Sequence, residues 1–183
     1  MANISLQISG IVTLGTSMDA ESQRTRDLGC WDIAPIGDSL IGGWSSKDAT
    51  PDFVLDDGFV GLLVSLGVGQ EADPALVQSM STNTKSVYVG DEGRRRARMC
   101  AVNLRDRDGL HGRLFDVTCP VLWMHGTADQ VYSVANAHEE IVLFVNAKET
   151  NLVKVDGGQH FLSASNPGEV EPAVVDFIKK HSV

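Results

Sequence analysis

The chain has 183 residues, of which 43% are hydrophobic and 21% are charged, and its formal net charge is −9 at pH 7. This length and composition are typical of one globular domain with a buried core, and they exclude a disordered or collagen-like chain. The acidic excess argues against a nucleic-acid binder or a protein of acidic membranes, because phosphate groups would be repelled. The longest apolar stretch, residues 60–68, is interrupted by glycine and serine, so we expect no membrane span. Residues 1–16 lack a basic start and their apolar run is broken by polar residues, so we expect no targeting segment.

The cysteines and histidines give no sign of a disulfide framework or a metal site. Cys30, Cys100 and Cys119 are an odd number, lack C-x-x-C spacing and lie beside large apolar residues, which predicts free, buried thiols and a reducing, cytoplasmic location. His125 and His138 form no metal-ligand spacing with any cysteine or carboxylate pair. We therefore expect no metal site.

The first 116 residues predict one strand followed by helices. A β-branched apolar run over residues 8–14 predicts a strand, and the polar residues 19–27 predict a turn or short helix. Helices are predicted after the acidic pair Asp56 and Asp57, after the N-cap signal Asp73-Pro74, and over residues 91 to about 107, with Gly109 as the stop.

The remaining residues alternate between strand and helix. The continuous apolar run of residues 117–124 predicts a strand buried on both faces of a parallel sheet. Ser133 is a candidate N-cap for a helix that reaches Phe144, residues 151–155 predict another strand, and residues 169–181 predict an amphipathic helix. The fold class is therefore α/β, a short and mostly parallel sheet with a helical insertion, divided into a first core segment (1–27), the insertion (28–116) and a β-α-β-α segment (117–183).

Two short segments carry the candidate chemistry, and each directly follows a predicted strand. Residues 125–129 contain Asp129, and residues 157–161 contain His160. Because open α/β sheets place their sites at the carboxyl ends of the strands, we expect the two side chains to meet there. An aspartate beside a histidine fixes the imidazole tautomer and stabilises the imidazolium that forms when the ring accepts a proton. Alternatively, Asp129 only caps the next helix and His160 is a partly buried loop residue.

The residues around these segments resemble the α/β-hydrolase fold family. The resemblance rests on Pro-Val-Leu-Trp-Met-His-Gly-Thr-Ala-Asp at 120–129, Gly-Gly-Gln-His-Phe-Leu at 157–162 with Asn166-Pro167, and Gly-Ile-Val-Thr-Leu-Gly-Thr-Ser at 10–17. It covers the whole chain but only the later half of the family's fold. The resemblance implies that Asp129 is the acid, that His160 is the general base, and that residues 28–116 form a helical lid.

The chain departs from the family at the nucleophile. Members carry a G-x-S-x-G elbow and an oxyanion-hole loop before the part that this chain resembles, and neither motif occurs in the sequence. Ser17, in Gly-Thr-Ser-Met, is the nearest approach, but the second glycine is missing and the strand is the wrong one, so a loop or cap role is expected. The resemblance thus implies an acid and a base without an activated hydroxyl.

Two further groups of residues could have either a binding role or a purely structural one. The arginines 94, 95, 96 and 98 could bind phosphate or carboxylate, but Asp91 and Glu92 favour a solvated helix start with local ion pairs. The aromatic side chains in the insertion could line an apolar substrate pocket or simply fill the core; they are Trp31, Trp44, Phe53 and Phe59.

The resemblance therefore implies an α/β-hydrolase-like protein related to ester or lactone hydrolases, which needs no cofactor and is inactive without a supplied nucleophile. Either the chain is truncated, or it is a stand-alone protein that has lost hydrolysis. The alternative is a non-catalytic ligand-binding or interaction module, or a repurposed cofactor-free enzyme, that uses the lid pocket. Expected partners are a small apolar acyl substrate or ligand, and either a second copy of the chain or a complementing N-terminal half. The second copy is expected because the first strand is an uncharged sheet edge.

Overall fold

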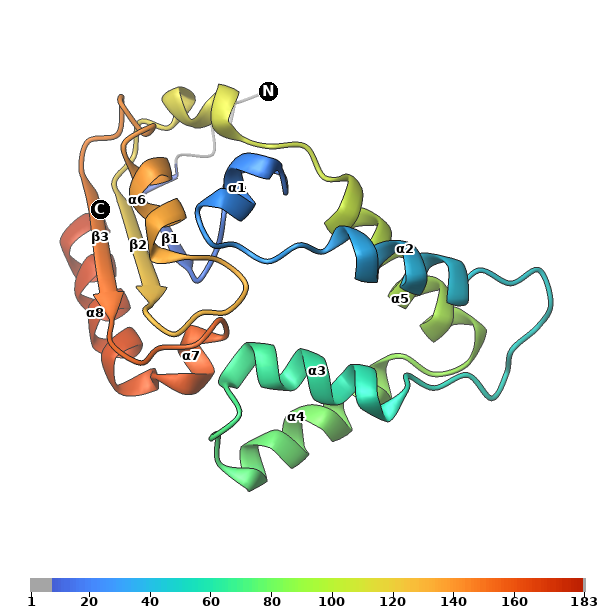
Figure 1. The fold of residues 1–183 in the computed structure, drawn as a ribbon. Helices are drawn as coiled ribbons and strands as arrows, with labels where there is room; N and C mark the ends of the chain where they lie inside the picture. The colour runs from blue at the N-terminus through green and yellow to red at the C-terminus, as the bar shows by residue number, and fades with distance from the viewer. Residues whose placement is uncertain (1–7, 183) are drawn as a thin grey trace, which may run out of the picture.

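The computed structural model describes residues 8–182, which form a parallel three-stranded sheet with helices on both faces (Figure 1). The strands are β1 (Ile11–Leu14), β2 (Val121–Gly126) and β3 (Thr150–Val155), and they lie in the order β1-β2-β3. All pairings are parallel, with Ile11 opposite Val121 and Val121 opposite Thr150. The predicted α/β class with a short parallel sheet is confirmed.

Helices cover the two faces of the sheet because β2 presents apolar side chains to both. Helix α6 (Val134–Ile141) packs on the face that carries Val121 and Trp123. The short helix α7 (Leu162–Ser165) and the long helix α8 (Pro167–His181) pack on the face of Leu122 and Met124. Every residue of β2 is buried, as the continuous apolar run predicted.

Between β1 and β2, where the structure describes every residue, the chain forms helices and loops but no strand, and residues 28–116, after α1, make up the insertion. In chain order the helices are α1 (Gln23–Asp27), α2 (Ala34–Gly43), α3 (Asp57–Val68), α4 (Pro74–Val87), α5 (Gly90–Asp106) and the 3-10 helix η1 (His111–Asp116). Helices α2 to α5 lie beside the sheet as a separate group, with α2 against α5 and α3 against α4 (Figure 1). Helix α3 also contacts α7. The insertion is therefore anchored to the part of the chain that follows β3.

The helices begin where the sequence predicts them because the capping side chains find their backbone donors. Asp56 accepts a hydrogen bond from Phe59 N at 3.0 Å, and Asp73 accepts one from Ala75 N at 2.7 Å. Ser133 accepts one from Asn136 N at 3.0 Å. These bonds satisfy backbone N–H groups that have no partner inside the helix.

Several predicted boundaries are wrong by a few residues. The central strand begins at Val121, not residue 117, because η1 extends to Asp116 and Pro120 has no N–H for the ladder. It also ends later, so His125 and Gly126 belong to the strand and not to the loop. Elsewhere β1 starts at Ile11 instead of residue 8, α6 ends at Ile141 instead of Phe144, and α5 ends at Asp106 before the extended Arg107.

Strand β1 forms one edge of the sheet that residues 8–182 build. The N–H groups of Ile11 and Gly15 donate to Pro120 O and Met124 O of the β2 segment, at 2.9 and 3.0 Å. By the alternation of a parallel ladder, the N–H and C=O groups of Val12 and Leu14 then point away from β2. The possibility that residues 1–7 cover this edge concerns residues outside those described.

The prediction of buried thiols is correct only for Cys30. All three cysteines are free, but Cys100 is exposed and Cys119 is half-buried. Cys30 lies against Val131 and Tyr132, and this burial raises the pKa of its thiol. Over residues 8–182, no helix is both long enough and apolar enough to cross a membrane.

Candidate functional site

The loops that follow β2 and β3 lie in direct backbone contact at the carboxyl edge of the sheet. Ala128 N donates to Gly158 O at 3.0 Å. A Cβ atom on Gly126 would lie 2.1 Å from the same carbonyl oxygen, so only glycine allows the two loops to approach so closely. This contact brings the segments that carry Asp129 and His160 together.

Asp129 uses its two carboxylate oxygens for two different purposes. Its Oδ1 atom accepts hydrogen bonds from Val131 N at 2.8 Å and Tyr132 N at 3.0 Å, which fixes the turn before α6. Its Oδ2 atom lies 3.1 Å from Nδ1 of His160, so the predicted hydrogen bond between the two residues is confirmed. The side chain of Asp129 is 0% exposed, whereas that of His160 is 22% exposed. The histidine partner is therefore the correct interpretation of Asp129; the helix cap is wrong, because Ser133 caps α6 and Asp129 holds the turn before it.

The orientation of His160 leaves its second ring nitrogen available. A carboxylate only accepts hydrogen bonds, so Nδ1 of His160 carries the proton that it shares with Asp129, and Nε2 is the free acceptor. The imidazole lies between two aromatic rings, with the centroids of Tyr132 and Phe161 both at 5.5 Å. The ring is thus held in one orientation while one edge remains open to solvent.

His125 is a member of this site that sequence reasoning did not connect to it. It is fully buried, and its Nε2 atom lies 2.9 Å from Tyr132 O and 3.6 Å from Oδ2 of Asp129. Because Trp123 Nε1 donates to its Nδ1 atom at 3.3 Å, the proton of the ring is on Nε2. The available signal was the spacing of two along β2, which places Trp123 and His125 on one face.

Tyr132 closes the site on the side of α1 and the insertion. Its hydroxyl donates to Glu21 Oε1 at 3.0 Å and accepts from Arg107 at 2.9 Å. Burial is the main cause that raises the pKa of this hydroxyl, and the Glu21 carboxylate acts in the same direction while Arg107 opposes it. Sequence reasoning did not select Tyr132, since a single tyrosine in a loop gives no periodic signal.

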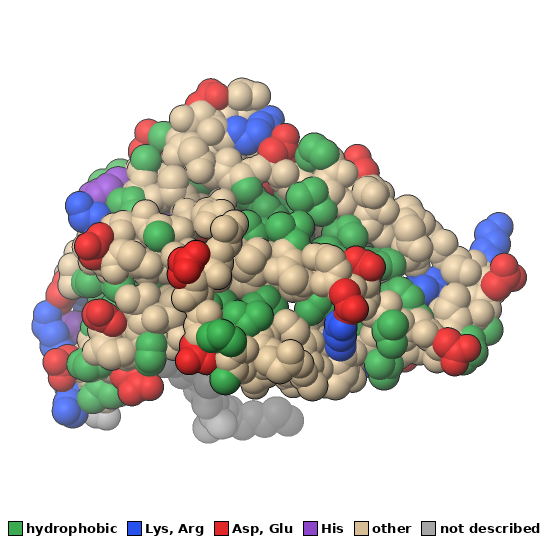
Figure 2. Space-filling model, turned by 60° about the horizontal axis from the view of Figure 1, so that its bottom comes forward, with side chains coloured by type: hydrophobic (Ala, Val, Ile, Leu, Met, Phe, Trp, Pro, Cys, Tyr) green, Lys and Arg blue, Asp and Glu red, His purple; other side chains and the backbone are tan. Residues whose placement is uncertain are grey.

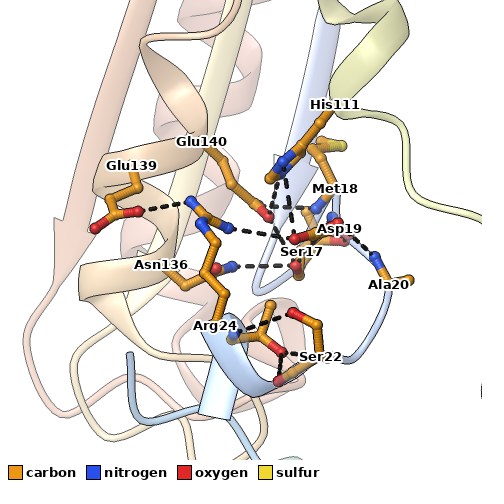
Figure 3. Close-up of polar contacts among 12 residues, drawn as sticks. Ser17, Met18, Asp19, Ala20, Ser22, Arg24, His111, Asn136, Glu139 and Glu140 are labelled. Atoms are coloured by element: carbon orange, nitrogen blue, oxygen red, sulfur yellow. Dashed lines mark hydrogen bonds and ion pairs between the residues drawn. The ribbon is translucent and has the colours of Figure 1, made fainter. Parts of the chain in front are cut away.

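Ser17 is buried in a different cluster of polar side chains (Figure 3). Its hydroxyl donates to Glu140 Oε1 at 2.9 Å and accepts hydrogen bonds from Asn136 Nδ2 and Asp19 N. The expectation of a loop role for Ser17 is thus met, because these bonds attach the loop after β1 to α6. Its hydroxyl proton is directed at a glutamate, not at His160.

A cavity of about 150 Å³ lies inside the insertion. Its walls come from α2, α3 and α5 and are almost entirely apolar; the aromatic members are Trp31, Trp44, Phe59 and Tyr88. Phe53 instead packs in the neighbouring core around Leu55. Trp31 also donates from its backbone N–H to Val131 O at 2.9 Å, so the wall of the cavity touches the loop that follows Asp129. On the face of the molecule shown in Figure 2, exposed hydrophobic side chains lie across the middle.

The arginine cluster on α5 serves mainly the fold of the insertion. Glu92 pairs with Arg95 at 2.7 Å and with Arg96 at 3.8 Å, which are the predicted local ion pairs. Arg94 is mostly buried and donates to Thr50 Oγ1 and Trp44 O, so it ties α5 to the segment after α2. Among residues 8–182, no group of three or more histidine, cysteine or acidic side chains is arranged to hold a metal ion.

Comparison with solved structures identifies the fold. Over 95% of its length the chain superposes on a thermophilic esterase from Thermogutta terrifontis, with a TM-score of 0.67 at 13% identity. It also superposes on MenH from S. aureus (TM-score 0.65, 16% identity, 99% of this chain) and on a hydrolase from Oleispira antarctica (0.65, 18%, 93%). The chain has the α/β-hydrolase fold.

The chain spans only part of the length of these α/β-hydrolase structures. It covers 57% of the esterase chain, 62% of MenH and 56% of the Oleispira hydrolase. No protein-family model matches the sequence, and no curated protein matches it. At these identities the likeness establishes the fold and leaves the activity to be argued from the site.

Proposed function

We propose that the chain supplies the acid and the general base of a cofactor-free hydrolase that acts on small apolar esters or lactones. The observation that carries this proposal is the 3.1 Å contact between the buried Asp129 carboxylate and Nδ1 of the partly exposed His160. In this arrangement Nε2 of His160 can accept the proton of a hydroxyl, and Asp129 stabilises the resulting imidazolium. The esterase among the structural neighbours supports the choice of reaction class.

The proposal includes a nucleophile from another polypeptide segment. Ser17 is engaged with Glu140, and the sequence contains no G-x-S-x-G elbow. We therefore infer that the chain alone does not turn over esters, because an activated hydroxyl and oxyanion donors are both required for efficient acyl transfer. In this proposal, helices α2 to α5 act as the lid over the acyl group.

The test is ester hydrolysis together with labelling by a serine-reactive fluorophosphonate. The purified chain is expected to show no p-nitrophenyl butyrate hydrolysis above that of its His160→Gln variant, and no label. The chain is then expressed together with an upstream segment, in the same reading frame, whose sequence predicts a strand, a G-x-S-x-G elbow and a helix. We expect this protein to hydrolyse the ester, and we expect His160→Gln to abolish that activity. Activity of the chain alone that disappears in Ser17→Ala would instead identify Ser17 as the nucleophile. Activity of the complemented protein that survives His160→Gln would overturn the proposed base.

A second candidate function, binding of an apolar ligand without reaction, is favoured by the cavity in the insertion. An apolar cavity of about 150 Å³ is large enough for a benzene-sized molecule. Binding of benzene or a short alkyl ester should quench or shift the fluorescence of Trp31 and Trp44. A response that is equal in Ala101→Leu, which fills the cavity, would exclude this site.

A further inference from the structure

Glu140 is a buried carboxylate that the proposed chemistry does not use. It lies in α6, is 0% exposed and accepts hydrogen bonds with both oxygens (Figure 3). Oε1 accepts from Ser17 Oγ at 2.9 Å and lies 3.0 Å from Nε2 of His111, while Oε2 accepts from Met18 N at 2.8 Å. Burial of a carboxylate is unfavourable unless such bonds replace water, so the three donors fix their positions relative to Glu140.

Two of these donors belong to the loop after β1, which also reaches the Asp129–His160 pair. Gly15 precedes Ser17 by two residues and has a φ of +53°. A Cβ atom on Gly15 would lie 2.5 Å from His160 O and 3.2 Å from Oδ2 of Asp129. The backbone of Gly15 therefore lies directly against both members of the pair, and a shift of this loop must displace them.

The third donor comes from the end of the insertion. Leu110 N donates to Met18 O at 2.6 Å, and His111 follows at the start of η1 with its Nδ1 atom 3.8 Å from Oδ2 of Asp19. Arg24 joins the same cluster, because it pairs with Asp19 at 3.3 Å and with Glu139 at 2.6 Å. The return of the chain from the insertion to the sheet is thus attached to the loop that supports the pair.

We propose that Glu140 is a positioning residue for the Asp129–His160 pair, acting through residues 15–18, and that His111 makes this positioning depend on the docking of the insertion. Glu140 touches neither member of the pair. It holds Ser17 and Met18, and these residues fix the position of Gly15. The backbone of Gly15 in turn fixes the position of His160 relative to Asp129. The inference rests on the proposed function, since it assigns Glu140 a role toward the proposed acid and base.

The experiment measures the ring nitrogens of His160 by long-range ¹H–¹⁵N NMR of the whole chain at pH 8. The five histidines are assigned with single His→Gln variants. In the unmodified chain we expect His160 in the Nδ1–H form that Asp129 selects. In Glu140→Gln the Nδ1–H fraction should fall, because the amide can no longer accept from all three donors. Glu139→Gln is the matched control: Glu139 is adjacent and binds Arg24, but it is exposed, and its variant should leave the His160 signals unchanged.

Two more variants separate positioning from a general loss of stability. Ser17→Ala removes one donor and should shift the His160 signals in the same direction by less, with thermal unfolding recorded in parallel. If docking of the insertion affects the Asp129–His160 pair, His111→Gln should shift the His160 signals as Ser17→Ala does. His160 signals that are unchanged in both Glu140→Gln and Ser17→Ala would overturn the proposal. The readout needs no nucleophile and no ester, so its result is independent of whether the chain contributes to hydrolysis.

Discussion

The Oδ2 atom of Asp129 lies 3.1 Å from Nδ1 of His160, although the residues are 31 positions apart and follow different strands. The other oxygen of the same carboxylate holds the backbone of Val131 and Tyr132. One buried side chain thus fixes the orientation of the histidine and the shape of the turn that leads into α6.

Replacing Asp129 should therefore reduce stability as well as change His160. In Asp129→Ala the two backbone donors lose their partner, and we expect the free energy of unfolding to fall by about 2–4 kcal/mol. Urea denaturation followed by circular dichroism measures the change. The control is Asp108→Ala, whose exposed side chain pairs with Arg113 and whose loss should cost less than about 0.5 kcal/mol. Equal losses in the two variants would contradict a dual role for Asp129.

A comparison of two glycines with positive φ separates the cost of a left-handed backbone from the cost of a steric clash. Gly15 has φ +53° and its missing Cβ would collide with His160 O, whereas Gly157 has φ +68° and nothing within 4 Å of that position. Gly157→Ala should cost about 1–2 kcal/mol from the left-handed backbone alone. Gly15→Ala should cost clearly more, because the contact adds to the same strain. Thermal and urea unfolding of both variants provide the comparison, and similar losses would mean that the loop moves away freely.

Filling the cavity from α2 should stabilise the chain. A Cβ on Gly37 would have its nearest neighbour, Arg105 Cβ, at 3.7 Å, so Gly37→Ala fits and removes the entropic cost of a helical glycine. We expect a gain of about 1 kcal/mol in the free energy of unfolding and weaker binding of benzene-sized ligands. The matched control is Gly93→Ala in α5, where the added atom would lie 2.4 Å from the Tyr88 backbone and should destabilise. A loss of stability in Gly37→Ala would show that this wall has no room.

Alkaline pH should weaken the fold through Tyr132. Burial raises the pKa of its hydroxyl above the ordinary value of 10.0, so the unfolded chain releases this proton at a lower pH than the folded chain. The stabilising effect of burying the neutral hydroxyl is complete below about pH 10 and is lost as the pH rises from there toward the folded pKa. The stability difference between the chain and its Tyr132→Phe variant should therefore narrow above about pH 10. Urea denaturation of both proteins at pH 8 and pH 11 tests this, and a stability difference that is the same at the two pH values would contradict it.

The edge position of β1 in the sheet of residues 8–182 predicts self-association. An uncharged edge strand offers its outward N–H and C=O groups to a second strand, and a two-fold dimer is the simplest result. Light scattering should give a mass above the 19.7 kDa of one chain. Val12→Pro removes an N–H that points away from β2 and should reduce the mass, whereas Thr13→Pro removes a ladder donor and should unfold the sheet. A constant 19.7 kDa species over a wide range of concentrations would show that the edge is covered.

The sequence predicted the elements better than their boundaries and the acid–histidine pair better than its surroundings. Asp129 and His160 could be found because each follows a predicted strand, and parallel strands bring their carboxyl ends to one edge. Capping residues such as Asp73 and Ser133 located helix starts, since a cap acts locally. The contacts of Tyr132 and Glu140 depend on packing between segments far apart in the chain. No local sequence pattern encodes such contacts. The hydrogen bond between Ser17 and Glu140 likewise depends on the fold and could not be predicted from the sequence.

The cavity among α2, α3 and α5 also makes the two parts of the molecule unequal in compressibility. Empty volume that disappears on unfolding lowers the volume of the system, and hydrostatic pressure favours the smaller volume. The core around Trp123 consists of buried apolar side chains, whereas the insertion contains a partly open apolar cavity of about 150 Å³. Under pressure, helices α2 to α5 should therefore open before the sheet does, and a molecule that occupies the cavity should delay that opening.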